Sequence, residues 1–181
     1  CSAASRAYIP KSMWSEVKEY VLEDLKNIKV GTPENFSNFV NAVIDEKAFD
    51  KIANYIDNAK RADSAEVIAG GSYDKSEGYF IDPTVILASD PKYTTMCEEI
   101  FGPVLSIVEV GSMDEAVRVN NNVKYGLSSS IFTENVNVAF RAIRDLTTGI
   151  VYINHGTTGA EIQFPFGGTR GTGNGMREAG Q

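Results

Sequence analysis

The stretch VLSIVEVGSMDEAVRVNNNVKYGLSSSIFTENVNVAFRAIRDLTTGIVYI, residues 104–153, decides the fold. Its apolar and β-branched runs predict strands at Val104–Val110, Ser128–Phe132 and Ile150–Ile153. A helix is predicted between each pair of strands: a capping box at Ser112–Glu115 opens the first, and Asn135–Leu146 forms the second. This β–α–β–α–β order is typical of a parallel sheet with right-handed crossovers. We therefore expect an α/β fold of three layers, a mainly parallel sheet with helices on both faces.

The preceding hundred residues predict less regular structure. Apolar residues recur at helical spacing over Met13–Ile28, and Asp45 is placed to cap a second helix. A short apolar strand is expected at Glu66–Ala69. Tyr79–Leu87 contains Pro83 and is therefore expected to be an extended segment near a sheet edge.

Composition limits the classes of function. Apolar residues make up 43% of the 181 residues and charged residues 23%, as in one folded globular domain. The net charge of −7 argues against a nucleic-acid partner or an anionic membrane surface, because binding phosphate needs a basic face. No apolar run approaches the roughly 20 residues of a membrane-spanning helix, and CSAASRAYIP shows no signal-peptide pattern.

Cysteine and histidine are scarce. Cys1 and Cys97 are too few for a disulfide scaffold, which favours a reduced, cytoplasmic protein. The single histidine, His155, argues against zinc sites built on several imidazoles, so no metal site is expected. We interpret His155 as a loop residue and Cys97 as a packed, unreactive thiol.

Cys1 is a candidate nucleophile. If the small and polar residues after it begin a helical turn, the thiolate would lie at a helix N-terminus, where the dipole and free N–H groups favour the ionised form. The alternative is that Cys1 has no function and is merely the first residue of the sequence.

Two other segments could bind a ligand, and each also has a purely structural interpretation. In EEIFGPV (Glu98–Val104) a carboxylate could grip a ribose diol and the aromatic could pack a nicotinamide ring, but a solvated acidic turn would have the same composition. In the glycine-rich tail, Thr157–Gly175, the N–H groups of Gly159 and Ala160 could meet an anion, or the segment could simply be a tight connection. GTGNG within it has the wrong spacing for a dinucleotide fingerprint.

The segments CSAASR, EEIFGPVLS, YGLSSSIFT and PFGGTRGTGNG, in this order, resemble the aldehyde dehydrogenase superfamily from one end of the chain to the other. The resemblance implies that residues 1–181 are the three-layer α/β catalytic domain of that family, with NAD, or alternatively NADP, as the cofactor. CSAASRAYIP, IKVGTPENF, AVIDEKAFDKI and GYFIDPTVI look most like 1-pyrroline-5-carboxylate dehydrogenases, which oxidise glutamate γ-semialdehyde.

The tail departs from that subgroup. Gly159–Phe166 is one residue shorter, and GAEIQFPFGG is similar to the aminoadipic- and ketoglutaric-semialdehyde branches instead. All these substrates carry a carboxylate remote from the aldehyde, so the resemblance implies a carboxylate-bearing semialdehyde.

The resemblance also implies roles for individual residues. Cys1 would attack the aldehyde carbon to form a thiohemiacetal, and loss of hydride would leave a thioester that water hydrolyses. Glu99 would hold the nicotinamide ribose, and Phe101 would pack near the ring. Cys1, Glu99 and Gly159 are expected to converge at one end of the sheet.

Four further residues would bind the substrate. The carboxylate would be anchored by Ser2, Gly159 and Ala160, and Phe166 would pack on the aliphatic chain. The family's general-base glutamate, oxyanion-hole asparagine and nucleotide-binding fold precede the cysteine, so they would belong to a nucleotide-binding half outside these 181 residues. We therefore expect the 181 residues alone to be inactive and the full-length protein to be a homo-oligomer.

Two other classes of function remain open. An amidohydrolase would use the Cys1 thiol with the α-amine as base, but such enzymes are usually built on stacked antiparallel sheets, whereas residues 104–153 predict a parallel one. The other class is a non-catalytic subunit or interaction module. Amide turnover that disappears on Cys1→Ala would favour the first class.

Overall fold

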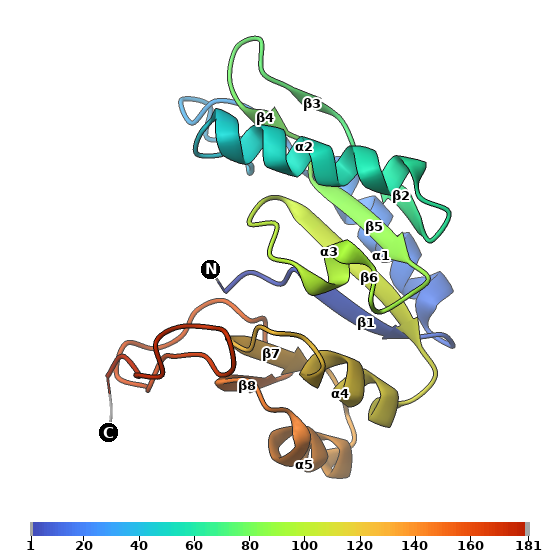
Figure 1. Ribbon diagram of the computed structural model, residues 1–181, viewed down its shortest axis with the longest axis vertical. Coiled ribbons are helices and arrows are strands. Elements are labelled where there is room, and N and C mark those ends of the chain that lie inside the picture. Colours follow the sequence, from blue (N-terminus) through green and yellow to red (C-terminus); the bar gives the residue numbers. More distant parts are fainter. Residues whose placement is uncertain (1, 180–181) are drawn as a thin grey trace. The chain divides into compact units, whose positions relative to one another are not determined.

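The computed structural model describes residues 2–179, which fall into two compact units (Figure 1). One unit is Ser5–Gly111, and the described part of the other comprises residues 2–4 and 112–179. The prediction of a single domain over residues 1–181 stays a prediction.

The first unit contains a four-stranded sheet in the order β1-β6-β5-β2. The strands are β1 (Arg6–Pro10), β6 (Val104–Val110), β5 (Thr84–Ala88) and β2 (Ala65–Ala69). β6 pairs in parallel with β1 and with β5, and only β2 runs antiparallel. The expected α/β class with a mainly parallel sheet is confirmed. β6 reads as a nearly continuous apolar run, as a strand paired on both edges and covered on both faces should.

Helices cover both faces of this sheet, with α2 (Glu46–Arg61) in front and α1 (Trp14–Asn27) behind in Figure 1. The predicted cap is confirmed, because the Asp45 carboxylate accepts a hydrogen bond from the Ala48 N–H at 2.7 Å. The apolar stripe of α2 packs on the sheet and contributes roughly 1.5–3 kcal/mol for each fully buried isoleucine. Its buried residues are Phe49, Ile52, Ala53, Ile56 and Ala59.

Short elements complete the unit: β3 (Tyr73–Asp74), β4 (Phe80–Ile81) and α3 (Thr94–Cys97). The expectation of a sheet-edge position for Tyr79–Leu87 is wrong for β5, which lies between β6 and β2. Pro83 falls between β4 and β5, so its missing N–H removes no bond from the ladder.

The second unit contains α4 (Met113–Asn121), β7 (Ser128–Ile131), α5 (Val136–Asp145) and β8 (Ile150–Ile153). β7 and β8 pair in parallel in a two-stranded sheet of their own. The expectation that β6, β7 and β8 form one hydrogen-bonded sheet is therefore wrong. Both edges of β6 are already occupied by β1 and β5, which leaves it no free edge for a further strand.

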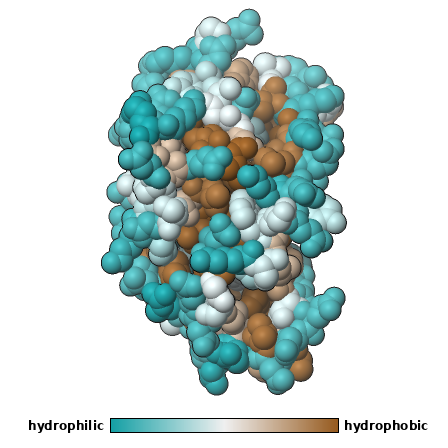
Figure 2. Space-filling model, turned by 90° about the vertical axis from the view of Figure 1, so that its right-hand side faces the viewer, coloured by the Kyte–Doolittle hydropathy of each residue, from teal (hydrophilic) through white to brown (hydrophobic). Residues whose placement is uncertain are grey.

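Both units leave large apolar side chains at the surface. Phe36, Ile44 and Ile162 are more than nine-tenths exposed, and Figure 2 shows apolar side chains gathered on one face. Within the described residues, no helix combines the length and apolar character needed to cross a bilayer.

Candidate functional site

The turn Glu98–Pro103 connects α3 to β6 and carries both predicted cofactor residues. Ile100 is buried in the core, whereas Glu99 and Phe101 are exposed. Phe101 has a φ of 60° and a side chain that is 67% exposed, a backbone conformation that bulky residues rarely adopt. The turn thus presents a carboxylate and an aromatic ring at the surface, and their predicted contacts with a nicotinamide ribose and ring stay a prediction.

Side chains of helix α2 contact this turn. The Lys51 ammonium donates a hydrogen bond to the Glu99 carbonyl at 2.8 Å, and the Tyr55 hydroxyl donates one to the Glu98 carboxylate. Gly102 lies so close that a Cβ there would be 2.4 Å from Cδ1 of Ile52. These contacts were not predicted, because no local pattern links α2 to a turn about 45 residues further along the chain.

A second group of predicted residues lies in the loop after β8. Asn154 follows the last residue of β8 and has a φ of 53°. Its side chain accepts a hydrogen bond from the Thr133 N–H at 2.7 Å and donates one to the Thr133 carbonyl at 2.9 Å. Gly159 has a φ of 89°, and a Cβ added there would meet nothing within 4 Å. Glycine is therefore needed at this position for its backbone conformation and not for space.

The N-terminal segment lies against this loop. The Thr157 hydroxyl donates a hydrogen bond to the Ser2 carbonyl at 2.5 Å, although the two residues are 155 positions apart. Cys1 itself lies outside the described residues. The hypothesis that it opens a helical turn is wrong, because residues 2–5 are not helical and lead directly into β1. Residues 2–5 therefore form no helix whose dipole could act on the thiolate.

Three of the predicted substrate residues line one cavity of about 320 Å³: Gly159, Ala160 and Phe166. Tyr152 and His155 line it too, with their rings stacked at a centroid distance of 5.7 Å. His155 was predicted only as a loop residue, and its position two residues after a strand was the one available signal of a role in the cavity. The walls are mainly apolar, with exposed Glu161 the one acidic residue among them.

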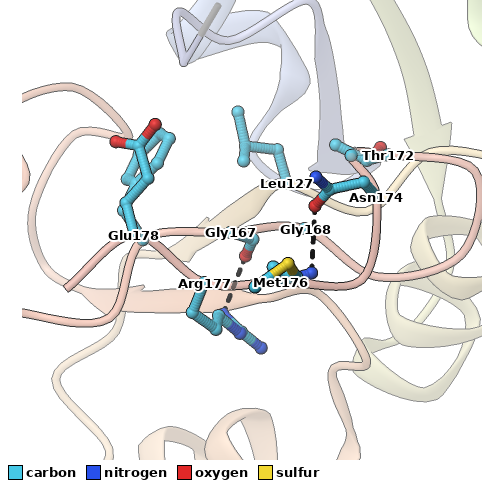
Figure 3. A pocket seen from close by; sticks show the side chains of 10 residues that line it. Leu127, Gly167, Gly168, Thr172, Asn174, Met176, Arg177 and Glu178 are labelled. Carbon is cyan, nitrogen blue, oxygen red and sulfur yellow. Dashed lines mark hydrogen bonds between the residues drawn. The ribbon is translucent and has the colours of Figure 1, made fainter. Parts of the chain in front are cut away.

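The glycine-rich tail lines most of a second, open cavity of about 520 Å³ (Figure 3). The Arg177 guanidinium donates to the carbonyls of Gly149, at 2.9 Å, and Gly167, at 2.7 Å. Phe166 lines both cavities and is fixed by two backbone hydrogen bonds of 2.8 Å with Glu178. The tail therefore holds Phe166 in place as a wall of the first cavity.

The predicted residues thus form two groups. Glu99 and Phe101 share one turn of the first unit, while Ser2 is tied to the loop of Gly159 and Ala160 in the second. The convergence of Cys1, Glu99 and Gly159 stays a prediction. Among residues 2–179, no three His, Cys, Asp or Glu side chains are grouped in a way that could hold a metal ion.

Comparison with known proteins identifies the family to which the chain is similar. The family model described as the aldehyde dehydrogenase family matches residues 1–181. The chain is 43% identical over 180 residues to the mitochondrial delta-1-pyrroline-5-carboxylate dehydrogenase of Dictyostelium discoideum, covering 96% of this chain and 32% of that protein. It is 40% identical to 1-pyrroline-5-carboxylate dehydrogenase 1 of Halalkalibacterium halodurans, covering 99% and 35%.

Solved structures agree. The 1-pyrroline-5-carboxylate dehydrogenase from Thermus with bound NAD superimposes with a TM-score of 0.91 at 34% identity, covering 99% of this chain and 34% of that one. Betaine aldehyde dehydrogenase from Staphylococcus aureus in complex with NAD⁺ also gives 0.91, at 30% identity, covering 99% and 36%. The chain spans about a third of the length of these relatives.

Proposed function

The chain belongs to the aldehyde dehydrogenase family, and from this premise we propose that it is the catalytic part of an NAD-dependent enzyme that oxidises a carboxylate-bearing semialdehyde. The names of the relatives support glutamate γ-semialdehyde as the substrate. Aminoadipic and ketoglutaric semialdehydes are the alternatives, because the tail GAEIQFPFGG is similar to those branches. NAD is supported by the relatives that were solved with it, and NADP is the alternative.

In the proposed reaction, the Cys1 thiolate attacks the aldehyde carbon and forms a thiohemiacetal. A bound nicotinamide would supply the acceptor for the hydride that this carbon loses. The resulting thioester is then hydrolysed by water, which releases the acid and regenerates the thiol. The exposed Glu99 carboxylate would bind the nicotinamide ribose, and the Phe101 ring would pack beside the nicotinamide.

The hydrogen bond from Thr157 to Ser2 carries the substrate part of the proposal. It holds the residue next to Cys1 against the loop of Gly159 and Ala160, whose cavity also contains Phe166. Backbone N–H groups around a glycine with positive φ can bind an anion without a charged side chain. A carboxylate bound there would leave the aliphatic chain of the substrate against Phe166.

We further propose that a nucleotide-binding half joins this chain in the complete enzyme, which is the polypeptide used in the experiments below. The complete enzyme is proposed to be a homo-oligomer in the cytoplasm, whose reducing conditions would keep the Cys1 thiol unmodified. We also propose that residues 1–181 form a single catalytic domain of that enzyme.

Gly159→Ala tests the carboxylate anchor. A side chain disfavours the φ of 89°, so the loop should shift and the KM for glutamate γ-semialdehyde should rise about tenfold, as expected for loss of a hydrogen bond to a charged group. The KM for an uncharged aldehyde of similar length should rise much less. The measurement is steady-state kinetics with both aldehydes in the complete enzyme.

Gly175→Ala is the matched control, because Gly175 also has a positive φ, 84°, with open space around it, yet does not line this cavity. It should leave both KM values unchanged. If Gly159→Ala raised the KM equally for both aldehydes, the loop would not select the carboxylate. Aminoadipic semialdehyde as the best substrate would favour the alternative branch.

A further inference from the structure

Two side chains of α2, one turn apart, contact two successive residues of the Glu98–Pro103 turn. Lys51 donates to the backbone carbonyl of Glu99 at 2.8 Å, and Tyr55 donates to the side chain of Glu98. Residues four apart lie on the same helix face, and the Lys51 ammonium is 6.0 Å from the centroid of the Tyr55 ring. Lys51 and Tyr55 therefore hold the turn from one side as a pair.

The residues around these contacts limit how the turn can move. Ile52, between Lys51 and Tyr55, is fully buried and packs against Gly102, while Ile100 is anchored in the core. Glu98 and Glu99, by contrast, are exposed, so the core does not hold them. The Glu98 N–H donates to the Thr94 carbonyl at 2.9 Å, and the two hydrogen bonds from α2 further restrain the Glu98 side chain and the Glu99 backbone.

We infer that Lys51 and Tyr55 are positioning residues that order the Glu98–Glu99 turn, so that the Glu99 carboxylate is already placed for the ribose diol of the dinucleotide. This inference rests on the proposed role of Glu99. Ordering a flexible turn costs free energy when a ligand binds, and a turn that is ordered beforehand avoids that cost. Neither residue needs to touch the dinucleotide for this effect.

Tyr55→Phe removes the hydrogen bond to Glu98, Lys51→Met removes the one to the Glu99 carbonyl, and both variants keep most of the side-chain volume. In the complete enzyme each should raise the KM for NAD about three- to tenfold, the ordering cost of one or a few side chains, with a smaller change in kcat. Hydrogen–deuterium exchange should become faster at residues 98–102. Tyr55→Phe and Glu98→Ala should not be additive, because they break the same contact.

The same helix supplies matched controls. The Tyr73 hydroxyl donates to the Asp57 carboxylate at 2.8 Å, and the Lys60 ammonium donates to the Gly71 carbonyl at 2.7 Å. Tyr73→Phe and Lys60→Met remove equivalent bonds away from the turn. They should speed exchange at residues 70–74 and leave both the KM for NAD and the exchange at residues 98–102 unchanged.

Glu99→Gln separates this inference from the function on which it rests. If Glu99→Gln leaves the KM for NAD unchanged, the proposed ribose contact is wrong, whatever the exchange data show. If Glu99→Gln raises that KM while Tyr55→Phe and Lys51→Met do not, the positioning role is wrong. An equal rise in the KM for NAD in Tyr73→Phe and Lys60→Met would also overturn the positioning role, because the rise would then not depend on contacts with the turn.

Discussion

At the residue scale, Phe101 combines an unfavourable backbone with an exposed ring, which predicts opposite effects on stability and on cofactor binding. Phe101→Gly keeps the left-handed conformation but relieves its steric cost, about 1–2 kcal/mol for a non-glycine residue. The greater entropy of glycine in the unfolded chain partly offsets this gain. We expect the free energy of unfolding to stay level or rise by up to about 1 kcal/mol. The KM for NAD should nevertheless rise, because the ring is lost.

Chemical denaturation and steady-state kinetics of the same variant measure the two effects. Phe39→Gly is the control, since Phe39 is also largely exposed, at 79%, but lies in another loop. It should lower the free energy of unfolding slightly and leave the KM for NAD unchanged. A clear loss of stability in Phe101→Gly would mean that the ring stabilises the turn in the free protein.

How far residues could be identified from the sequence depends on the range of their contacts. Glu99 and Phe101 are neighbours in one motif, so the turn could be predicted from the motif alone. Lys51 and Tyr55 could not, because α2 reaches the turn only through the folded sheet. The positive φ of Phe101 was equally hidden, since left-handed conformations are expected at glycine and asparagine and not at phenylalanine.

At the element scale, the start of β8 is tied to the glycine-rich tail through Gly149. A Cβ at this position would lie 1.8 Å from the Gly167 carbonyl oxygen, a backbone atom that cannot turn aside. Gly149→Ala should therefore displace the tail and lower the free energy of unfolding by about 1–3 kcal/mol. Hydrogen–deuterium exchange should rise at residues 166–178, because Arg177 would lose its two carbonyl partners together.

Gly156→Ala is a suitable comparison, because a Cβ there would meet nothing within 4 Å. It should change the free energy of unfolding by much less than Gly149→Ala. If the two variants were equally stable, the tail would have to be free to move away from β8 without cost.

The strands show which elements a local pattern can predict. β6 and β8 were predicted with the bounds that the structure gives, because each is a β-branched apolar run between clear turns. β1 was missed, since RAYIP has no such pattern, and its partner is about 100 residues away. That omission also explains the wrong sheet: with β1 on one edge of β6 and β5 on the other, β7 had to pair elsewhere.

At the scale of the whole molecule, the two groups of site residues belong to two compact units, and large apolar side chains remain exposed in both. Patches of exposed apolar side chains are typical of interfaces with another domain or subunit. The relatives are about three times as long as this chain, which agrees with the proposed nucleotide-binding half. Composition could not reveal these surfaces, because apolar content says nothing about which residues become buried.

The proposed division between this chain and a nucleotide-binding half predicts how residues 1–181 behave as a separate polypeptide. In the proposed function the turn of residues 98–103 supplies only the ribose contact, and the nucleotide-binding half binds the rest of the dinucleotide, so NAD should not bind tightly to the 181 residues. A ligand at a hundred times its Kd stabilises a protein by about 2.7 kcal/mol. Millimolar NAD should therefore raise the Tm of the complete enzyme by several degrees and leave that of the 181-residue polypeptide unchanged.

With NAD and glutamate γ-semialdehyde present, NADH should form only in the complete enzyme, and its formation should be lost in the Cys1→Ala variant of that enzyme. NADH formation by the unsupplemented 181 residues would contradict the proposed division of labour between the two halves.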